Sequence, residues 1–136
     1  MDTQKWISIA AKIFIGFSAC SLLSVSLMAF VNPQTVMDLV HVRLTNTDAF
    51  SSIRGVYGGV GFTLFIGLVY LMLKDVPLGL AFLALLWGFY ALSRGITILV
   101  EGPLGSFGFQ WIITESVFFI FSAVLFMLYP KTAKTV

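Results

Sequence analysis

The sequence predicts an all-α integral membrane protein, an antiparallel bundle of four membrane-spanning helices. Three observations carry this prediction: 59% of the 136 residues are apolar, only 10% are charged, and the mean hydropathy is +1.00. With so few charges, a water-soluble fold could not cover its surface, whereas a membrane bundle needs polar residues mainly at helix ends and internal seams. At this length the chain is expected to form a single domain over residues 1–136.

Four apolar runs are each long enough to cross a hydrocarbon core of about 30 Å. They cover about residues 6–31, 51–73, 78–100 and 107–129. The first run is interpreted as a span rather than a cleaved signal peptide, because it exceeds the usual apolar core of ~7–15 residues and lacks a clean A-x-A cleavage site. The short links between later runs predict antiparallel neighbours.

A short helix lying along the membrane interface is expected between the first two spans, from Pro33 to Val42. Asn32 is a good N-cap and Pro33 suits the first helical position. A polar turn follows, in which Asp48 is placed to cap the second span.

Helix-breaking residues mark the remaining ends. The second span ends at residues 74–77, which include Pro77, and the third ends at residues 101–106, which hold two glycines and a proline. Pro130 follows the fourth span.

The distribution of basic residues predicts that both termini lie in the cytoplasm. Arg43 is alone in the loops of one side. The flanks of the other side carry Lys5, Lys12, Lys74, Lys131 and Lys134.

The stretch from Ile53 to Gly61 is rich in glycine and opens the second span. Residues four apart form a ridge of small side chains, suited to close helix packing inside the bundle or to self-association. The ridge consists of Gly55, Gly59, Thr63 and Gly67. The adjacent face of the helix consists of Arg54, Tyr57, Gly58 and Gly61.

Three ionisable residues, Arg54, Arg94 and Glu115, remain inside the spans at similar depth, in the outer third. An unpaired charge at such a position costs from about 3 to over ~10 kcal/mol, so mutual pairing is expected. Arg94 and Glu115 are the first-choice pair, because arginine can hold a carboxylate with two parallel hydrogen bonds. Glu101 or a bound anion would balance the surplus positive charge.

Aromatic residues stand at helical spacing around these charges, which suits a cavity with an aromatic wall and a charged end. Such a cavity would take a planar or amphipathic ligand with an acidic or carbonyl head. The alternative is a purely structural network, in which the ion pair fixes helix register and the aromatic residues fill the core. The candidate ligand-binding or polar-network residues are Arg54, Tyr57, Gly58, Gly59, Trp87, Tyr90, Arg94, Glu101, Trp111 and Glu115.

Composition excludes other classes of site. Cys20 is the single cysteine, so the chain has no CxxC pair and no thiolate metal cage. The single histidine, His41, has no second ligand of metal type near it, and the spans offer no axial pair for haem. The net charge of +2 forms no basic patch, and no nucleic-acid partner is expected.

The segment from Asn32 to Gly61, with the Arg-x-x-Tyr-Gly-Gly signature at residues 54–59, resembles a family of small bacterial four-span membrane proteins of unknown function. Arg94 and Glu115 support the resemblance, which covers nearly the whole chain. The family is grouped loosely with DoxX-like proteins. The resemblance implies a four-helix fold in the bacterial inner (plasma) membrane and a link to respiratory or quinone-coupled partners. It carries over no catalytic residue.

The predicted function is that of a membrane binding or accessory protein, and the sequence does not indicate an enzyme. No cofactor is predicted beyond a bound lipid or quinone, and the expected partners are membrane lipids, further copies of the chain or a larger membrane complex. The alternative function is an oligomeric channel or carrier for small anions, since four spans alone are too few to enclose a wide pore.

Overall fold

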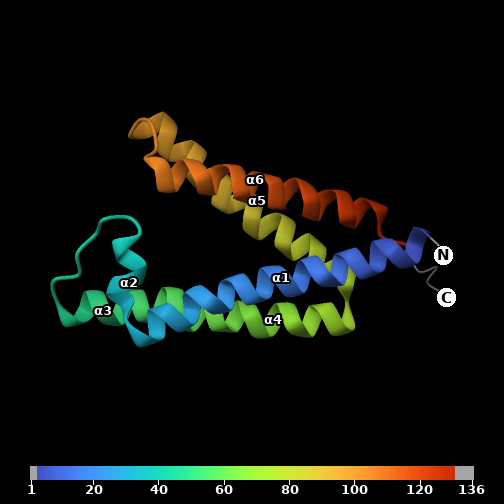
Figure 1. Cartoon of the computed structure of the whole chain (residues 1–136), viewed down its shortest axis with the longest axis horizontal. Coiled ribbons are helices and arrows are strands. Elements are labelled where there is room, and N and C mark those ends of the chain that lie inside the picture. The colour runs from blue at the N-terminus through green and yellow to red at the C-terminus, as the bar shows by residue number, and fades with distance from the viewer. Residues whose placement is uncertain (1–2, 131–136) are drawn as a thin grey trace. The chain divides into compact units, whose positions relative to one another are not determined.

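The computed structural model describes residues 3–130, and its regular elements there are all helices (Figure 1). Four helical segments of this range are long and apolar enough to cross a membrane, which confirms the predicted all-α, four-span fold. They are α1 (Thr3–Val31), the continuous segment Thr47–Lys74, α5 (Val76–Val100) and α6 (Ser106–Leu128). The segment Thr47–Lys74 consists of α3 (Thr47–Ile53), the π-helix η1 (Arg54–Val60) and α4 (Gly61–Lys74).

Contacts between residues divide the chain into two compact units. The terminal unit comprises residues 1–15 and 74–136, and so holds the start of α1 together with α5 and α6. The central unit comprises residues 16–73 and holds the rest of α1, the short helix α2 (Pro33–Asp38), α3, η1 and α4. The single four-helix domain therefore stays a prediction.

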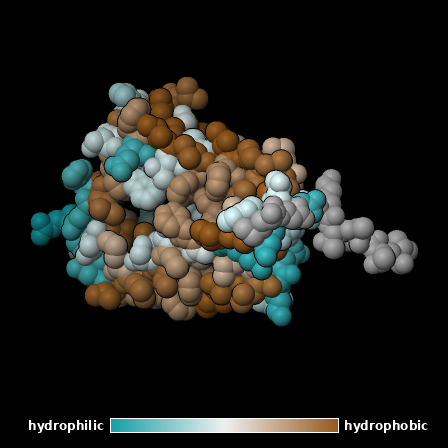
Figure 2. Space-filling view, turned by 45° about the vertical axis from the view of Figure 1, so that its right-hand side comes forward, coloured by the Kyte–Doolittle hydropathy of each residue, from teal (hydrophilic) through white to brown (hydrophobic). Residues whose placement is uncertain are grey.

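The surface is that of a protein whose solvent is largely lipid. The face shown in Figure 2 is covered mainly by hydrophobic residues, and hydrophilic residues gather at its margins. Large apolar side chains are exposed along the spans, including Ile13, Phe89 and Leu99. Exposing so much apolar surface to water would be unfavourable, whereas contact with the hydrocarbon of a membrane is not.

In the terminal unit, α5 and α6 pack against each other along the chain's last helical hairpin (Figure 1). Asp75 caps α5, because its carboxylate accepts a hydrogen bond from the Leu78 backbone N–H at 3.1 Å. Gly88 favours close approach of the two helices, because a Cβ atom there would stand only 3.0 Å from the Phe119 ring.

In the central unit, the second half of α1 lies beside η1 and α4 (Figure 1). The Ser26 hydroxyl donates to the Gly58 carbonyl at 2.6 Å. A Cβ atom at Gly58 would stand 3.0 Å from the Phe30 ring, and one at Gly61 would stand 3.1 Å from the Ser26 Cβ. Glycine at these two positions is what lets the helices approach.

The predicted ridge of small residues does not make this contact. Apart from their own chain neighbours and nearby helix backbone, no described atom lies within 4 Å of where a Cβ would stand at Gly55, Gly59 or Gly67. The physical reason is that residue spacing shows which side chains share a helix face but not which face meets a neighbouring helix. Here Arg54, Gly58 and Gly61 meet α1. The packed positions belong to the adjacent face.

The link between the first two spans starts as expected and ends differently. The Asn32 side chain accepts from the Gln34 N–H and Pro33 occupies the first turn of α2, which confirms both cap positions. The helix ends at Asp38 rather than at Val42. Whether α2 lies along a membrane surface stays a prediction.

The expectation that Asp48 caps the second span is wrong. The cap is Asn46, whose side-chain oxygen accepts from the Ala49 N–H at 2.8 Å, and α3 begins at Thr47. Asn and Asp are equally good N-caps, so their types alone do not decide between them. Asp48 lies in the first helical turn, where a negative charge still favours the helix dipole.

Candidate functional site

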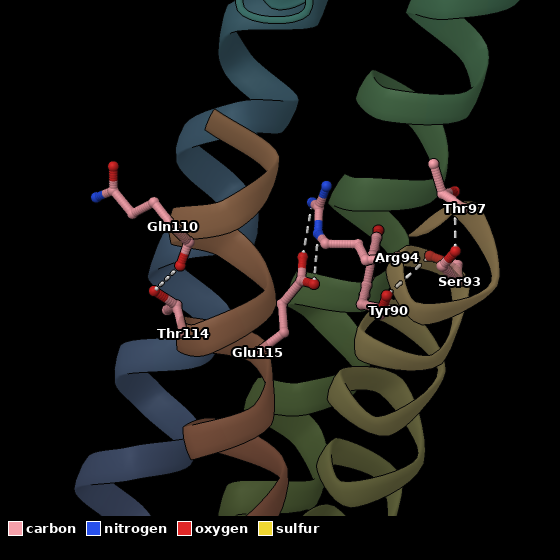
Figure 3. Close-up of polar contacts among 7 residues, drawn as sticks. All are labelled: Tyr90, Ser93, Arg94, Thr97, Gln110, Thr114 and Glu115. Carbon is pink, nitrogen blue, oxygen red and sulfur yellow. Dashed lines mark hydrogen bonds and ion pairs between the residues drawn. The ribbon is translucent and has the colours of Figure 1, made fainter. Parts of the chain in front are cut away.

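A buried ion pair joins α5 and α6 (Figure 3). The Arg94 Nε atom donates to Glu115 Oε2 at 2.6 Å, and its Nη2 atom donates to Glu115 Oε1 at 2.8 Å. The Glu115 side chain is 3% exposed and that of Arg94 is 22% exposed. This confirms the predicted pair, with the two parallel hydrogen bonds that the guanidinium and carboxylate geometry favours.

The pair holds the guanidinium in one orientation and balances its charge. A guanidinium has five N–H donors, and the contacts with Glu115 use two of them. The remaining donors lie on the edge of Arg94 that faces away from the carboxylate, as Figure 3 shows. Because Arg94 is the more exposed partner, these donors are the polar groups through which the site can meet another molecule.

Hydroxyl groups near the pair do not join it. Ser93 donates to the Tyr90 carbonyl, Thr97 to the Ser93 carbonyl and Thr114 to the Gln110 carbonyl (Figure 3). Each of these bonds runs to the preceding turn of the same helix, the usual way for a hydroxyl to be satisfied inside a membrane span. The hydroxyl groups of Ser93, Thr97 and Thr114 are therefore already hydrogen-bonded within their own helices.

An aromatic cluster lies next to the pair on the same two helices. The Trp87 ring packs 5.2 Å from the Phe118 ring, edge to face, and 6.0 Å from the Tyr90 ring. Phe118 in turn meets Phe14 of α1 at 5.5 Å, and Phe14 meets Phe121 at 5.0 Å. Edge-to-face contacts of this kind are favourable because the positive ring edge meets the negative ring face.

Trp87 also carries an unsatisfied hydrogen-bond donor. Its side chain is buried, with 4% exposure, and its indole Nε1 atom has no hydrogen-bond partner among the residues that the structure describes. A buried N–H without a partner costs roughly 1–3 kcal/mol, so an additional acceptor at this position would be stabilising.

Arg54, predicted to join the same network, belongs to the central unit. Its Nε atom donates to the Phe30 carbonyl at 3.1 Å. That carbonyl lies in the last turn of α1, where backbone acceptors lack helical partners and a positive charge complements the helix dipole. Arg54 therefore caps α1, and a three-member network with Arg94 and Glu115 stays a prediction.

The other predicted site residues have separate environments. Tyr57 is exposed at the surface of η1, and Gly58 packs against α1. Trp111 packs 6.1 Å from Phe107. Glu101 is exposed at the end of α5, and the ion pairs of the described residues do not include it. Its expected role in balancing the surplus positive charge of the two arginines therefore stays a prediction.

Sequence reasoning missed Phe14, Phe118 and Gly88. Phe118 stands three residues after Glu115 and so shares its helix face, a spacing that could have identified it. Phe14 comes from a distant part of the chain, and no local pattern brings it to α6. Gly88 is one of several glycines in apolar runs, and only the packed helices distinguish it from the others.

Together these features define a multi-pass membrane protein in which a charge-balanced arginine lies beside an aromatic cluster. Residues 10–126 match a family described as a domain of unknown function, DUF4345, and because the match spans most of the chain, the protein belongs to that family. No curated protein and no solved structure matched the chain significantly.

Proposed function

We propose that the terminal unit binds the oxygen-bearing head of a membrane-soluble ligand at Arg94, and that the protein acts as a binding or accessory component. The proposal rests on one observation, the environment of the Arg94 guanidinium. It is fixed by a buried carboxylate, is partly exposed, and keeps unused N–H donors. Such a preorganised donor binds an acceptor without first losing its own side-chain freedom.

A neutral carbonyl suits this site better than an anion does. Glu115 already neutralises Arg94, so an incoming anion would meet a balanced pair rather than a free cation. The unsatisfied Trp87 N–H is itself a neutral donor suited to a carbonyl oxygen. The rings of Trp87, Tyr90 and Phe118 offer an apolar wall for a planar group. A quinone has both a carbonyl oxygen and a planar ring, whereas a lipid ester has only the carbonyl oxygen.

A quinone ligand also agrees with the DoxX-like resemblance and its link to respiratory partners. The chain would then hold or deliver a quinone for another membrane protein, since its one cysteine, Cys20, provides no dithiol for redox chemistry. The proposed location is the bacterial inner membrane, with both termini in the cytoplasm.

Native mass spectrometry of the gently extracted protein, with extraction and identification of any retained small molecule, tests the proposal. We expect wild-type protein to retain a carbonyl-bearing lipid or quinone. Trp87→Phe keeps the ring and removes the N–H, and Arg94→Lys keeps the positive charge beside Glu115 and removes the planar fork. Both variants should retain severalfold less ligand.

The matched control is Phe89→Leu, at an exposed position of the same helix. It should retain as much ligand as wild type. Wild-type protein that carries no such molecule, or equal retention by all variants, would leave the ion pair with a structural role and overturn the proposal. The spectra also give the subunit count, on which the alternative of an oligomeric anion channel depends.

A further inference from the structure

A second polar site lies in the link between the first two spans. It is a cavity of about 600 Å³ in the central unit, formed by the end of α2, the following loop and the start of α3. Its lining residues are Gln34, Asp38, His41, Val42, Arg43, Leu44 and Phe50. Cavities of ~300–1,000 Å³ are of the size that holds small ligands.

The Gln34 side chain organises this cavity. Its Nε2 atom donates to Asp38 Oδ1 at 2.6 Å and to the Val42 carbonyl at 2.9 Å, and its Oε1 atom accepts from the Leu44 N–H at 2.9 Å. Both N–H donors of the Gln34 amide are thus used, and the loop surrounds this side chain. The Gln34 amide thereby holds Asp38, Val42 and Leu44 around itself.

A helix-ending turn sets the direction of the loop. The Val42 N–H donates to the Met37 carbonyl at 3.1 Å and the His41 N–H donates to the Asp38 carbonyl at 3.2 Å. With His41 in the left-handed conformation, at a φ of 57°, these bonds form a Schellman motif. Leu44 then packs onto the buried cluster that contains Val36 and Met37. The hydrogen bonds of the turn and the packing of Leu44 therefore fix the shape of the cavity.

The cavity presents one charge of each sign. Asp38 and Arg43 are both exposed lining residues, and neither is in an ion pair within residues 3–130. The Asp38 carboxylate receives one hydrogen bond, from Gln34, and so keeps acceptor capacity. The link joins α1, which ends at Val31, to the segment that begins at Thr47. Because both segments are long and apolar enough to cross a membrane, the link between them is expected near the membrane surface.

We propose that this cavity binds the headgroup of phosphatidylethanolamine, a zwitterionic phospholipid. The primary ammonium donates to the Asp38 carboxylate and the phosphate accepts from the Arg43 guanidinium, with the His41 ring beside it. Val42, Leu44 and Phe50 contact the carbon atoms of the headgroup and glycerol. An anionic headgroup would leave Asp38 facing negative charge, and a choline headgroup has no N–H to donate. The two charges therefore favour a primary amine next to a phosphate.

The experiment titrates the intact protein in detergent with short-chain phosphatidylethanolamine, phosphatidylglycerol or phosphatidylcholine, and counts bound lipids by native mass spectrometry. Wild-type protein should bind phosphatidylethanolamine roughly tenfold more tightly than the other two. Asp38→Asn keeps an oxygen for Gln34 but removes the charge, so the preference should disappear while the loop persists. Arg43→Gln should weaken binding of all three phospholipids.

Matched controls are Asp48→Asn, an exposed acid in the first turn of α3, and Lys74→Gln, a basic residue at the far end of α4. Both should retain the wild-type preference. Equal affinity for the three lipids, a preference for phosphatidylglycerol, or an unchanged preference in Asp38→Asn would each overturn the proposal.

Free phosphoethanolamine distinguishes a lipid headgroup from a soluble ligand of the same chemistry. If it competes only at millimolar concentration, the lipid assignment is supported, since the acyl chains then contribute to binding. If it binds as tightly as the lipid does, the assignment to a membrane lipid is overturned.

Discussion

Glu115 is a carboxylate that the chain can bury only together with Arg94. Its side chain is almost completely removed from solvent, and both of its oxygens accept from the guanidinium. A buried ion pair of this kind adds little net stability compared with apolar residues of the same volume, but losing one partner is costly. The pair therefore makes helices α5 and α6 depend on each other through two residues.

Replacing Arg94 by alanine should destabilise the protein by on the order of 3–5 kcal/mol, because Glu115 would remain buried without a partner. Thermal unfolding in detergent, followed by circular dichroism, measures the change. The double variant Arg94→Met with Glu115→Leu should recover most of the loss, since it removes both charges. An unfolding temperature unchanged by Arg94→Ala would show that the pair contributes nothing to stability.

Glycine 58 and glycine 59 are neighbours in the sequence with different surroundings. A Cβ at Gly58 would meet the Phe30 ring, and one at Gly59 meets nothing in the central unit. We expect Gly58→Ala to cost about 1–3 kcal/mol through overpacking. Gly59→Ala should be neutral or stabilising by up to ~1 kcal/mol, because alanine is the better helix former. Equal unfolding temperatures for the two variants would contradict the packing of η1 on α1.

At the scale of elements, the π-helix η1 is the least expected feature. Gly58 of η1 and Gly61 at the start of α4 pack against α1, whereas Gly55, Gly59 and Gly67 of the predicted ridge have no such neighbour. Arg54, at its first position, reaches the last turn of α1. Segments of π-helix often mark functional positions, but here the contacts that η1 makes are contacts between helices.

The end of α2 provides a prediction about a single backbone conformation. His41 adopts a left-handed φ that costs a residue with a Cβ atom about 1 kcal/mol and costs glycine almost nothing. His41→Gly should therefore raise the free energy of unfolding by up to ~1 kcal/mol, while His41→Val, which is β-branched, should lower it by more than that. Thermal unfolding of both variants in the same detergent checks the order, and a stable valine variant would contradict the turn.

At the scale of the whole molecule, four apolar helical segments with exposed large side chains define a multi-pass membrane protein of the DUF4345 family. Orientation in the membrane depends on a small number of basic residues. Two of those used for the prediction, Lys131 and Lys134, lie outside the described residues. The orientation of the protein in the membrane therefore has to be measured on the whole chain.

We expect both termini to be cytoplasmic, because lysines flank the membrane on that side and Arg43 is alone in the opposite loops. A fluorescent protein fused to the C-terminus should fluoresce, and alkaline phosphatase at the same position should be inactive. Fusions placed in the link at residues 101–105 should give the reverse result. Active phosphatase at the C-terminus would show that the predicted orientation is inverted.

The sequence by itself determined the class of protein, the number of spans and the pairing of Arg94 with Glu115. Hydropathy, span length and the cost of an isolated charge in hydrocarbon are properties of local sequence, and they constrain the outcome strongly. The N-cap at Asn32 follows from the same kind of local chemistry.

Only the tertiary structure decided which glycines carry helix packing, that Arg54 caps α1, and that Phe14 joins the aromatic cluster beside Trp87. These features depend on contacts between residues far apart in the chain. Residue spacing within one helix reports which side chains share a face. It does not report which face meets a neighbour, because that depends on how whole helices approach one another.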